Sequence, residues 1–290
     1  MALILALVIH GPARAAGATP DDEFVGPFES WANAKADYGA TGDGVTDDTA
    51  ALQQALNELG TSGHAPVLYL PAGTYRVSST LALESRLYVS IIGANPATTS
   101  LKWTGPAGGV LARFAGIAYS RINRLTFDGS NRAAVLVDQA WNCGQNYFDT
   151  GNEYTDDVFT RAGIGLRGGN NGCGFAETTV KRNRFVGLTT AGIALKNFNA
   201  LDLWVWYSRF ENCAVGITND PGAGNFHVYE SLFLNSTVSD MYVKNTGGFS
   251  IRNNTSIGSK ACWTTAKPSR YPATITLQGN AISTTSPSPI

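Results

Sequence analysis

VKRNRF (180–185) is one of six related stretches that recur along the chain. The others are INRLTF (122–127), VWYSRF (205–210), VYESLF (228–233), IRNNTS (251–256) and LQGNAI (277–282). Each begins with an aliphatic residue, and all but IRNNTS end with a large apolar one. The last five stretches recur about every 25 residues, a period typical of repeat architectures. We expect one more turn in the longer first gap, ending near Tyr154.

Each repeat contains two short β runs, for example VKRNRF followed by AGIALKN, with Gly, Asn, Ser and Thr between them. No intervening segment is long enough for the crossover helix of an ordinary α/β fold. Stacked turns of two or three strands form a parallel β-helix. A small polar residue recurs at the fourth position, which predicts a hydrogen-bonded ladder at a bend: Asn183, Ser208, Ser231, Asn254 and Asn280.

The composition is that of a turn-rich β protein, with 32 glycines and only 15% charged residues among 290. The net charge of −1 gives no drive towards nucleic acid, and no apolar run is long enough to span a membrane. The apolar run ALILALVI (2–9), followed by alanines, resembles a secretory signal. We therefore expect a signal peptide over 1–18, a β-helix domain over 19–282, a Ser/Thr/Pro-rich tail over 283–290, and an extracellular protein.

Four cysteines permit disulfides in an exported chain. Cys143 and Cys173 are about one turn of the solenoid apart, so they are placed to stack and bond. Cys213 and Cys262 are about two turns apart, which is farther than a disulfide reaches without a detour.

Two N-terminal segments stand apart from the repeats: DYGATGDGVTDDTAALQQAL (37–56) and VLYLPAGTYRV (67–77). The first predicts a helix that Asp47 or Asp48 caps and Gly60 ends, with an apolar face formed by Leu52, Ala55, Leu56 and Leu59. The second predicts a buried strand, a turn and a second strand. We expect Asp43, Asp47 and Asp48 to hold the turn and the helix end, not to take part in catalysis.

Together these two segments resemble the N-terminal signature of the pectate-lyase superfamily, which includes polygalacturonase-like hydrolases, glucanases, alginate epimerases and phage tailspike depolymerases. The resemblance implies a single-stranded right-handed parallel β-helix with the helix over 48–59 covering its first turn. It also implies a polysaccharide as substrate. The hydrolases' NTD, GHG and RIK motifs and the epimerases' DPHE motif are missing from this chain, so neither mechanism transfers residue by residue.

Stacking the repeats in register places equivalent residues about 4.8 Å apart and so predicts surface rows. One row contains Lys181, Trp206, Tyr229 and Arg252. An aromatic pair flanked by cations suits an anionic sugar chain, because a sugar face stacks on a ring while a cation meets the carboxylate. A second row stacks Arg184 on Arg209, with Glu153 beside them.

Acidic residues concentrate in the longest departure from the repeat, GNEYTDDVFTRAGIGLRGGNNGCG (151–174). Asp156 and Asp157 are candidates either for binding Ca²⁺ through hard oxygen ligands or for the acid–base pair of a glycosidase. Other candidate acids follow the repeats: Asp128, Glu211 and Asp240.

Three functions remain open. The first is a lyase that cleaves a uronate polysaccharide by β-elimination, with Ca²⁺ or the cations neutralising the carboxylate and with Lys181, Arg184 or Arg209 as base. Lys181 is chemically the easiest base of the three. The second is a glycoside hydrolase of polygalacturonase or glucanase type that uses paired carboxylates. The third is a non-catalytic, glycan-binding or adhesive β-helix that uses Trp206 and Tyr229.

Overall fold

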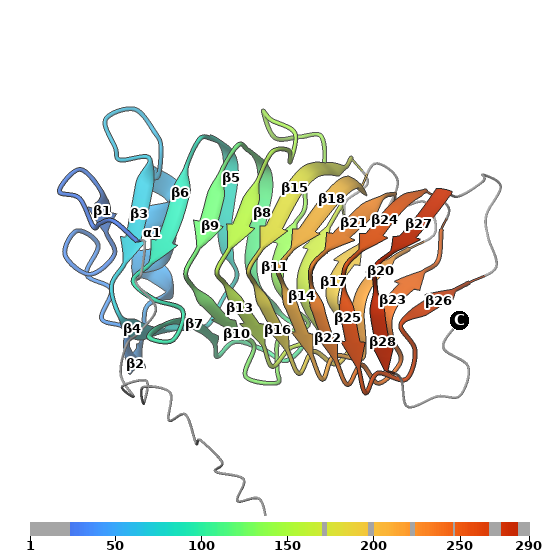
Figure 1. The fold of residues 1–290 in the computed structure, drawn as a ribbon. Helices are drawn as coiled ribbons and strands as arrows, with labels where there is room; N and C mark the ends of the chain where they lie inside the picture. The colour runs from blue at the N-terminus through green and yellow to red at the C-terminus, as the bar shows by residue number, and fades with distance from the viewer. Residues whose placement is uncertain are drawn as a thin grey trace, which may run out of the picture.

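The described part of the chain winds into a solenoid of three parallel β-sheets with one short helix near its N-terminal end (Figure 1). The computed structural model describes residues 24–169, 173–196, 200–220, 224–245, 247–266 and 274–283. All strand pairings join successive turns, so the repeats predicted from the sequence stack as expected. The parallel β-helix is confirmed, with three strands in each full turn.

Sheet I contains β1 (Ala32–Asn33), β3 (Val67–Leu70), β6 (Ser90–Gly93), β9 (Arg121–Asn123), β12 (Glu153–Thr155), β15 (Phe175–Lys181), β18 (Ala200–Trp206), β21 (Phe226–Tyr229), β24 (Gly248–Arg252) and β27 (Thr274–Gln278). Sheet II contains β2 (Asp43–Asp47), β4 (Gly73–Val77), β7 (Thr99–Trp103), β10 (Thr126–Asp128), β13 (Val158–Thr160), β16 (Arg184–Val186), β19 (Arg209–Glu211), β22 (Leu232–Leu234), β25 (Thr255–Ile257) and β28 (Ala281–Ser283). Sheet III contains β5 (Leu81–Leu87), β8 (Val110–Ala118), β11 (Val135–Gln139), β14 (Ile164–Gly168), β17 (Ala191–Leu195), β20 (Val215–Asn219), β23 (Ser239–Val243) and β26 (Trp263–Thr265).

The turn expected to end near Tyr154 exists, but the predicted alignment of that turn was wrong. Tyr154 pairs with Val180, which opens a six-residue stretch, and Phe159 is the residue in register with the last position, Phe185. The physical reason is an insertion before β12. The turn from Leu125 to its equivalent residue Asp157 is 32 residues long, whereas the next turn, from Asp157 to Asn183, is only 26 residues long.

A ladder of polar side chains follows the bend between sheets I and II, as predicted. Each side chain accepts a hydrogen bond from the backbone N–H of the equivalent residue one turn earlier. The distances are 2.7 Å for Asn183, 3.2 Å for Ser208, 3.1 Å for Ser231, and 2.9 Å for Asn254 and Asn280. Asp157 extends the ladder by one turn, because it accepts from Leu125 N–H at 2.9 Å. These bonds satisfy backbone groups that would otherwise be buried without a partner.

A column of phenylalanines fills the core behind sheet II. The stacked rings are Phe127, Phe159, Phe185, Phe210 and Phe233, with neighbouring centroids 4.7–5.1 Å apart. A glycine in sheet III faces each of the last three rings, and a Cβ added at Gly192, for example, would approach Phe210 to 2.7 Å. One turn beyond Phe233 both partners change. Asp240 replaces the glycine, Ser256 replaces the phenylalanine, and the Ser256 hydroxyl donates a hydrogen bond to the Asp240 carboxylate. The stretch IRNNTS, which ends in Ser256 instead of a large apolar residue, therefore replaces a phenylalanine–glycine contact in the core by a serine–aspartate hydrogen bond.

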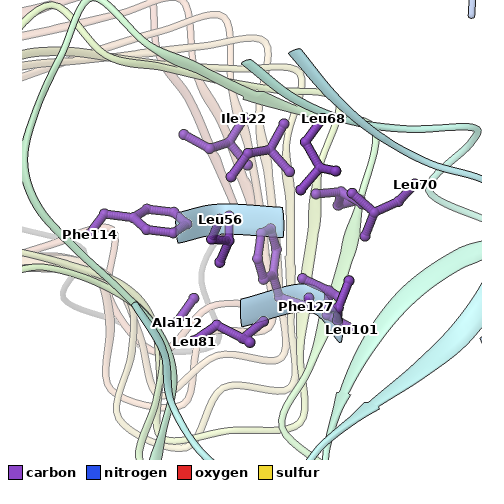
Figure 2. Close-up of a pocket in the computed structure, with 12 residues that line it drawn as sticks. Leu56, Leu68, Leu70, Leu81, Leu101, Ala112, Phe114, Ile122 and Phe127 are labelled. Atoms are coloured by element: carbon purple, nitrogen blue, oxygen red, sulfur yellow. The ribbon is translucent and has the colours of Figure 1, made fainter. Parts of the chain in front are cut away.

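Helix α1 (Thr49–Glu58) covers the N-terminal end of this core and buries Leu52, Ala55 and Leu56, as the sequence predicts. Figure 2 shows Leu56 among the apolar side chains of the first turns. The residues that line this space contain no polar side chain, so it is packed core rather than a sugar site.

The capping detail differs from the prediction. Asp48 occupies the N-cap position, but its carboxylate accepts hydrogen bonds from the earlier loop, including Thr41 N–H at 2.6 Å. Asp47 instead accepts from Thr49 N–H at 3.1 Å. Both acids therefore hold the junction between the first strands and α1, which agrees with the structural role expected for them.

The predicted disulfide joins Cys143 and Cys173, and Cys213 and Cys262 are unpaired and buried. Asp149 holds the loop that carries Cys143, because its carboxylate accepts from the N–H groups of Ile117 and Trp141, each at 2.9 Å. This carboxylate is fully buried, and burial raises its pKa from 3.8 to about 7.

We expect the Asp149 carboxylate to make folding stability depend on pH. The folded protein binds this proton more tightly than the unfolded chain, so the stabilisation is present below about pH 4 and is lost as the pH rises towards 7. Because one pKa unit corresponds to about 1.4 kcal/mol, the loss amounts to a few kcal/mol at most. Urea unfolding of the wild type and of Asp149→Asn, repeated between about pH 4 and about pH 7, measures this loss of folding free energy. Parallel pH profiles for the two proteins would contradict the assignment.

The expected signal peptide at 1–18 and all of the tail beyond Ser283 lie outside the described residues, so both stay predictions. Among the residues that the structure does describe, no helix is long and apolar enough to cross a membrane.

Candidate functional site

The outer surface of sheet I carries the aromatic row predicted from the sequence. Trp206 of β18 is in register with Tyr229 of β21, and their ring centroids are 4.5 Å apart. The rings are tilted by 37°. Figure 1 shows β18 and β21 side by side in the C-terminal half of the solenoid. The prediction that these two rings are neighbours is confirmed.

A second pair of rings lies beside the first and was missed. Trp204 stacks on His227, with centroids 5.7 Å apart and planes 26° apart. The signal was present in ALDLWVW (200–206), because residues two apart in a strand point to the same face. Tyr207 adds an exposed ring at the corner after β18. We call the set of Trp204, Trp206, Tyr207, His227 and Tyr229 the aromatic face.

Two cations continue the row on either side of the aromatic face. Lys181 is in register with Trp206, and Arg252 is in register with Tyr229. Among the residues that the structure describes, neither cation has an ion-pair partner. Their charges are therefore available to an anionic ligand that lies along the row.

The arginine row on sheet II is confirmed, but its predicted acidic partner was wrong. Arg184 and Arg209 are in register and both contact Glu211, at 3.0 and 2.7 Å. Glu153 lies on sheet I, where it pairs with Arg121 at 3.1 Å. The misalignment of the Tyr154 turn placed Glu153 five positions from its true location. Since Glu211 engages both guanidinium groups, we assign neither arginine as a base.

Asp156 and Asp157 do not fit a calcium site. The Asp156 carboxylate accepts two hydrogen bonds from Arg182, each at 2.7 Å. Asp157 is 1% exposed in the polar ladder, and burial raises its pKa well above the usual value. In the described parts of the chain, no three His, Cys, Asp or Glu side chains are grouped to hold a metal ion.

The remaining candidate acids are also separated from one another. Asp128 is bound by Arg161, Glu211 by the two arginines of sheet II, and Asp240 by Ser256 inside the core. Burial raises the pKa of Asp240. None of these carboxylates faces another across an open surface, which is the arrangement that a glycosidase requires.

Sheet III carries a charged surface that sequence analysis missed. Arg113 and Arg167 flank the buried carboxylate of Asp138, and Arg167 donates to it at 2.8 and 2.7 Å. Farther along, Asp220 lies between Lys196 and Lys244.

The lysine–aspartate group had a signal in the sequence. Lys196, Asp220 and Lys244 each occupy the sixth or seventh place of a second β run, in AGIALKN, AVGITND and SDMYVKN. The backbone pairing aligns these runs. Asp138 and Asp220 lie on turns that are three strand spacings apart, about 14 Å along the axis. This is too far for the two carboxylates to act together as the acid pair of a glycosidase. All four of these cations are ion-paired, two to each carboxylate, in contrast to Lys181 and Arg252.

Comparison with known proteins supports the β-helix fold. Residues 31–144 match a family model described as rhamnogalacturonase A/epimerase, pectate lyase-like. The fold is a pectate-lyase-like β-helix. The solved alginate lyase from Paenibacillus sp. str. FPU-7 superimposes on this β-helix with a TM-score of 0.52 at 14% identity, over 87% of this chain and 98% of that one.

Two curated relatives match part of the chain. Mannuronan C5-epimerase AlgE1 of Azotobacter vinelandii is 40% identical over 105 residues, which is 32% of this chain and 7% of that protein. Alginate lyase 7 of the same organism is 36% identical over 107 residues, 32% of this chain and 12% of that protein. The β-helix therefore spans only a small part of these relatives.

Proposed function

We propose that the protein is an enzyme that modifies an acidic polysaccharide, and that it cleaves a uronate-containing chain by β-elimination. The observation that carries this proposal is the row of Lys181, Trp206, Tyr229 and Arg252, with an aromatic pair at 4.5 Å between two cations that have no described ion-pair partner. The pectate-lyase-like fold and the relatives named as alginate lyase and mannuronan epimerase support a uronate polymer as substrate.

In this proposal the polymer lies along the solenoid axis, with sugar faces on Trp206 and Tyr229. Arg252 contacts a uronate carboxylate. Lys181 removes the proton at C5 of the sugar on the reducing-end side of the cleaved bond. The C5–H electron pair forms the C4–C5 double bond, the C4–O bond of the same sugar breaks, and the leaving glycosidic oxygen takes a proton from solvent water. No step runs through calcium, because Asp156 and Asp157 do not fit such a site.

A C5-epimerase is the second candidate, because the chain is 40% identical to a protein of that name over 105 residues. It begins with the same proton abstraction, and the carbon is then reprotonated from the other face instead of losing its leaving group. The same row serves the proton abstraction in both reactions, and in the epimerase the second proton comes from solvent water on the other face of the sugar.

The products distinguish these reactions. The protein is incubated with polymannuronate, alginate, polygalacturonate and a neutral glucan, and the products are analysed by ultraviolet absorbance and proton NMR. We expect absorbance of an unsaturated uronate on at least one polyuronate and none on the glucan. Changed C5 configuration without that absorbance favours the epimerase. Hydrolytic reducing ends, or binding without any turnover, would contradict the proposal and favour the hydrolase or the non-catalytic binder.

We further propose that the protein is exported. The apolar run at 2–9 and the bond between Cys143 and Cys173 support an oxidising, extracellular location.

A further inference from the structure

Three tyrosines expose more than half of their surface in the described chain, and all three lie at corners that border sheet I. Their exposed fractions are 68% for Tyr88, 52% for Tyr119 and 51% for Tyr207. Each has a positive φ, between 49° and 55°, which L-residues other than Asn, Asp and Gly rarely adopt. Tyr207 belongs to the aromatic face, whereas Tyr88 and Tyr119 lie at the opposite corner and several turns nearer the N-terminus.

Tyr88 and Tyr119 form a stacked pair on the surface. Their ring centroids are 5.5 Å apart and their planes differ by 18°. They occupy equivalent corner positions in successive turns, since the preceding residues Leu87 and Ala118 are paired. The next corner residue is Gly151, where an added Cβ would lie 2.5 Å from the Tyr119 ring. Because Gly151 has no side chain, the Tyr119 ring packs directly over the backbone of Gly151.

We propose that the Tyr88–Tyr119 pair is a second, remote subsite for the same polysaccharide chain that occupies the aromatic face. This inference rests on the proposed function. Both rings keep more than half of their surface exposed, and exposed aromatic side chains grouped in this way mark binding sites. Sugars bind such rings through the apolar faces of their own rings. The pair borders the same sheet as the aromatic face, at a distance of several strands.

The residues between the two surfaces favour one path for the chain. The outward row in register with Lys181 continues through Thr155 and Asn123, which are uncharged and lie at the far ends of their strands from the tyrosine corner. Between this row and the corner, Arg121 and Glu153 pair at 3.1 Å, so the acid on this path is matched by a cation. The corner row beyond Gly151 instead holds Glu177 and Asp202, which would repel an anionic polymer. The chain therefore crosses sheet I from the tyrosine corner to the row of Lys181.

The separation requires a long substrate. Sheet I has three spacings between β9, which follows Tyr119, and β18, which carries Trp206. At about 4.8 Å each they amount to about 14 Å along the axis. A trisaccharide on the aromatic face does not reach the tyrosine pair once this distance and the width of the sheet are added, whereas a long polymer does. The pair should therefore increase affinity only for long chains.

The test measures binding of a uronate trisaccharide and of the long polymer, by calorimetry, to the wild type and to Tyr88→Ala/Tyr119→Ala. We expect the double variant to bind the polymer about tenfold more weakly and the trisaccharide equally well. Tyr88→Phe/Tyr119→Phe keeps both rings and should bind both ligands as the wild type does. If the alanine double variant does not fold, Tyr88→Ala alone, at the most exposed position, replaces it.

Three results would overturn the inference. Unchanged polymer affinity in the alanine variant would leave the proposed function intact and remove the remote subsite. An equal loss for trisaccharide and polymer would place both tyrosines within the main site. If the wild type bound neither ligand, the proposed function itself would fail, and the subsite with it.

Discussion

Replacing Lys181 by methionine should lower kcat on the cleaved polyuronate by about 10²- to 10⁴-fold, the range typical for loss of a general base. Methionine retains most of the length of the side chain but cannot accept the C5 proton. KM should change less, because Trp206, Tyr229 and Arg252 still contact the substrate. Initial rates of product absorbance over a range of polymer concentrations measure both parameters.

A matched variant separates a base from a binding group. Lys181→Arg keeps the positive charge in the same row but replaces the amine by a far weaker base. If Lys181 is the base, the arginine variant should be almost as impaired in kcat as the methionine variant. Arg252→Met should instead mainly raise KM, because Arg252 only binds. Full activity in Lys181→Arg would show that this residue binds carboxylates and that the base lies elsewhere.

Phe210→Ala should destabilise the solenoid by about 3–5 kcal/mol, the range for removing a buried phenylalanine. Phe210 is fully buried, and its ring stacks at 4.7 Å on both Phe185 and Phe233. Its loss leaves a cavity in the middle of the column that the rigid turns cannot close. Urea unfolding followed by circular dichroism measures the change in free energy of unfolding.

A control on the same sheet is Ile257→Ala, where the side chain is 48% exposed. This variant should change stability by at most about 0.5 kcal/mol. A loss in Phe210→Ala as small as that in the control would contradict the account of the core, because the phenylalanine column would then not be a principal source of stability.

The fold was largely predictable from the sequence because a solenoid repeats its contacts at a fixed interval. The fourth-position ladder and the pairing of Trp206 with Tyr229 follow directly from aligning stretches of constant length. The Cys143–Cys173 bond follows in the same way. Residues one turn apart become neighbours wherever the turn length is known.

The same argument explains the failures. An insertion before β12 changes the length of the repeat. The prediction therefore placed Glu153 beside the arginines of sheet II instead of on sheet I, and it missed that Asp157 belongs to the buried ladder. Asp157 was expected in an open acidic loop and instead lies in the buried ladder.

The charged surface of sheet III was missed for another reason. Strands of sheet III follow turns of variable length, so the sequence gives no fixed register for Asp138 and its two arginines. Which cation is paired also depends on side-chain geometry. Only the structure shows that Glu211 pairs with both arginines of sheet II while Lys181 has no such partner among the described residues.

The central claim is that sheet I, and not sheet III, holds the polysaccharide. A crystal structure of the protein with a uronate oligosaccharide tests it most directly. We predict sugar rings over Trp206 and Tyr229, with a carboxylate within hydrogen-bonding distance of Lys181 or Arg252. An oligosaccharide bound instead along sheet III, between Arg167 and Lys244, would contradict the account.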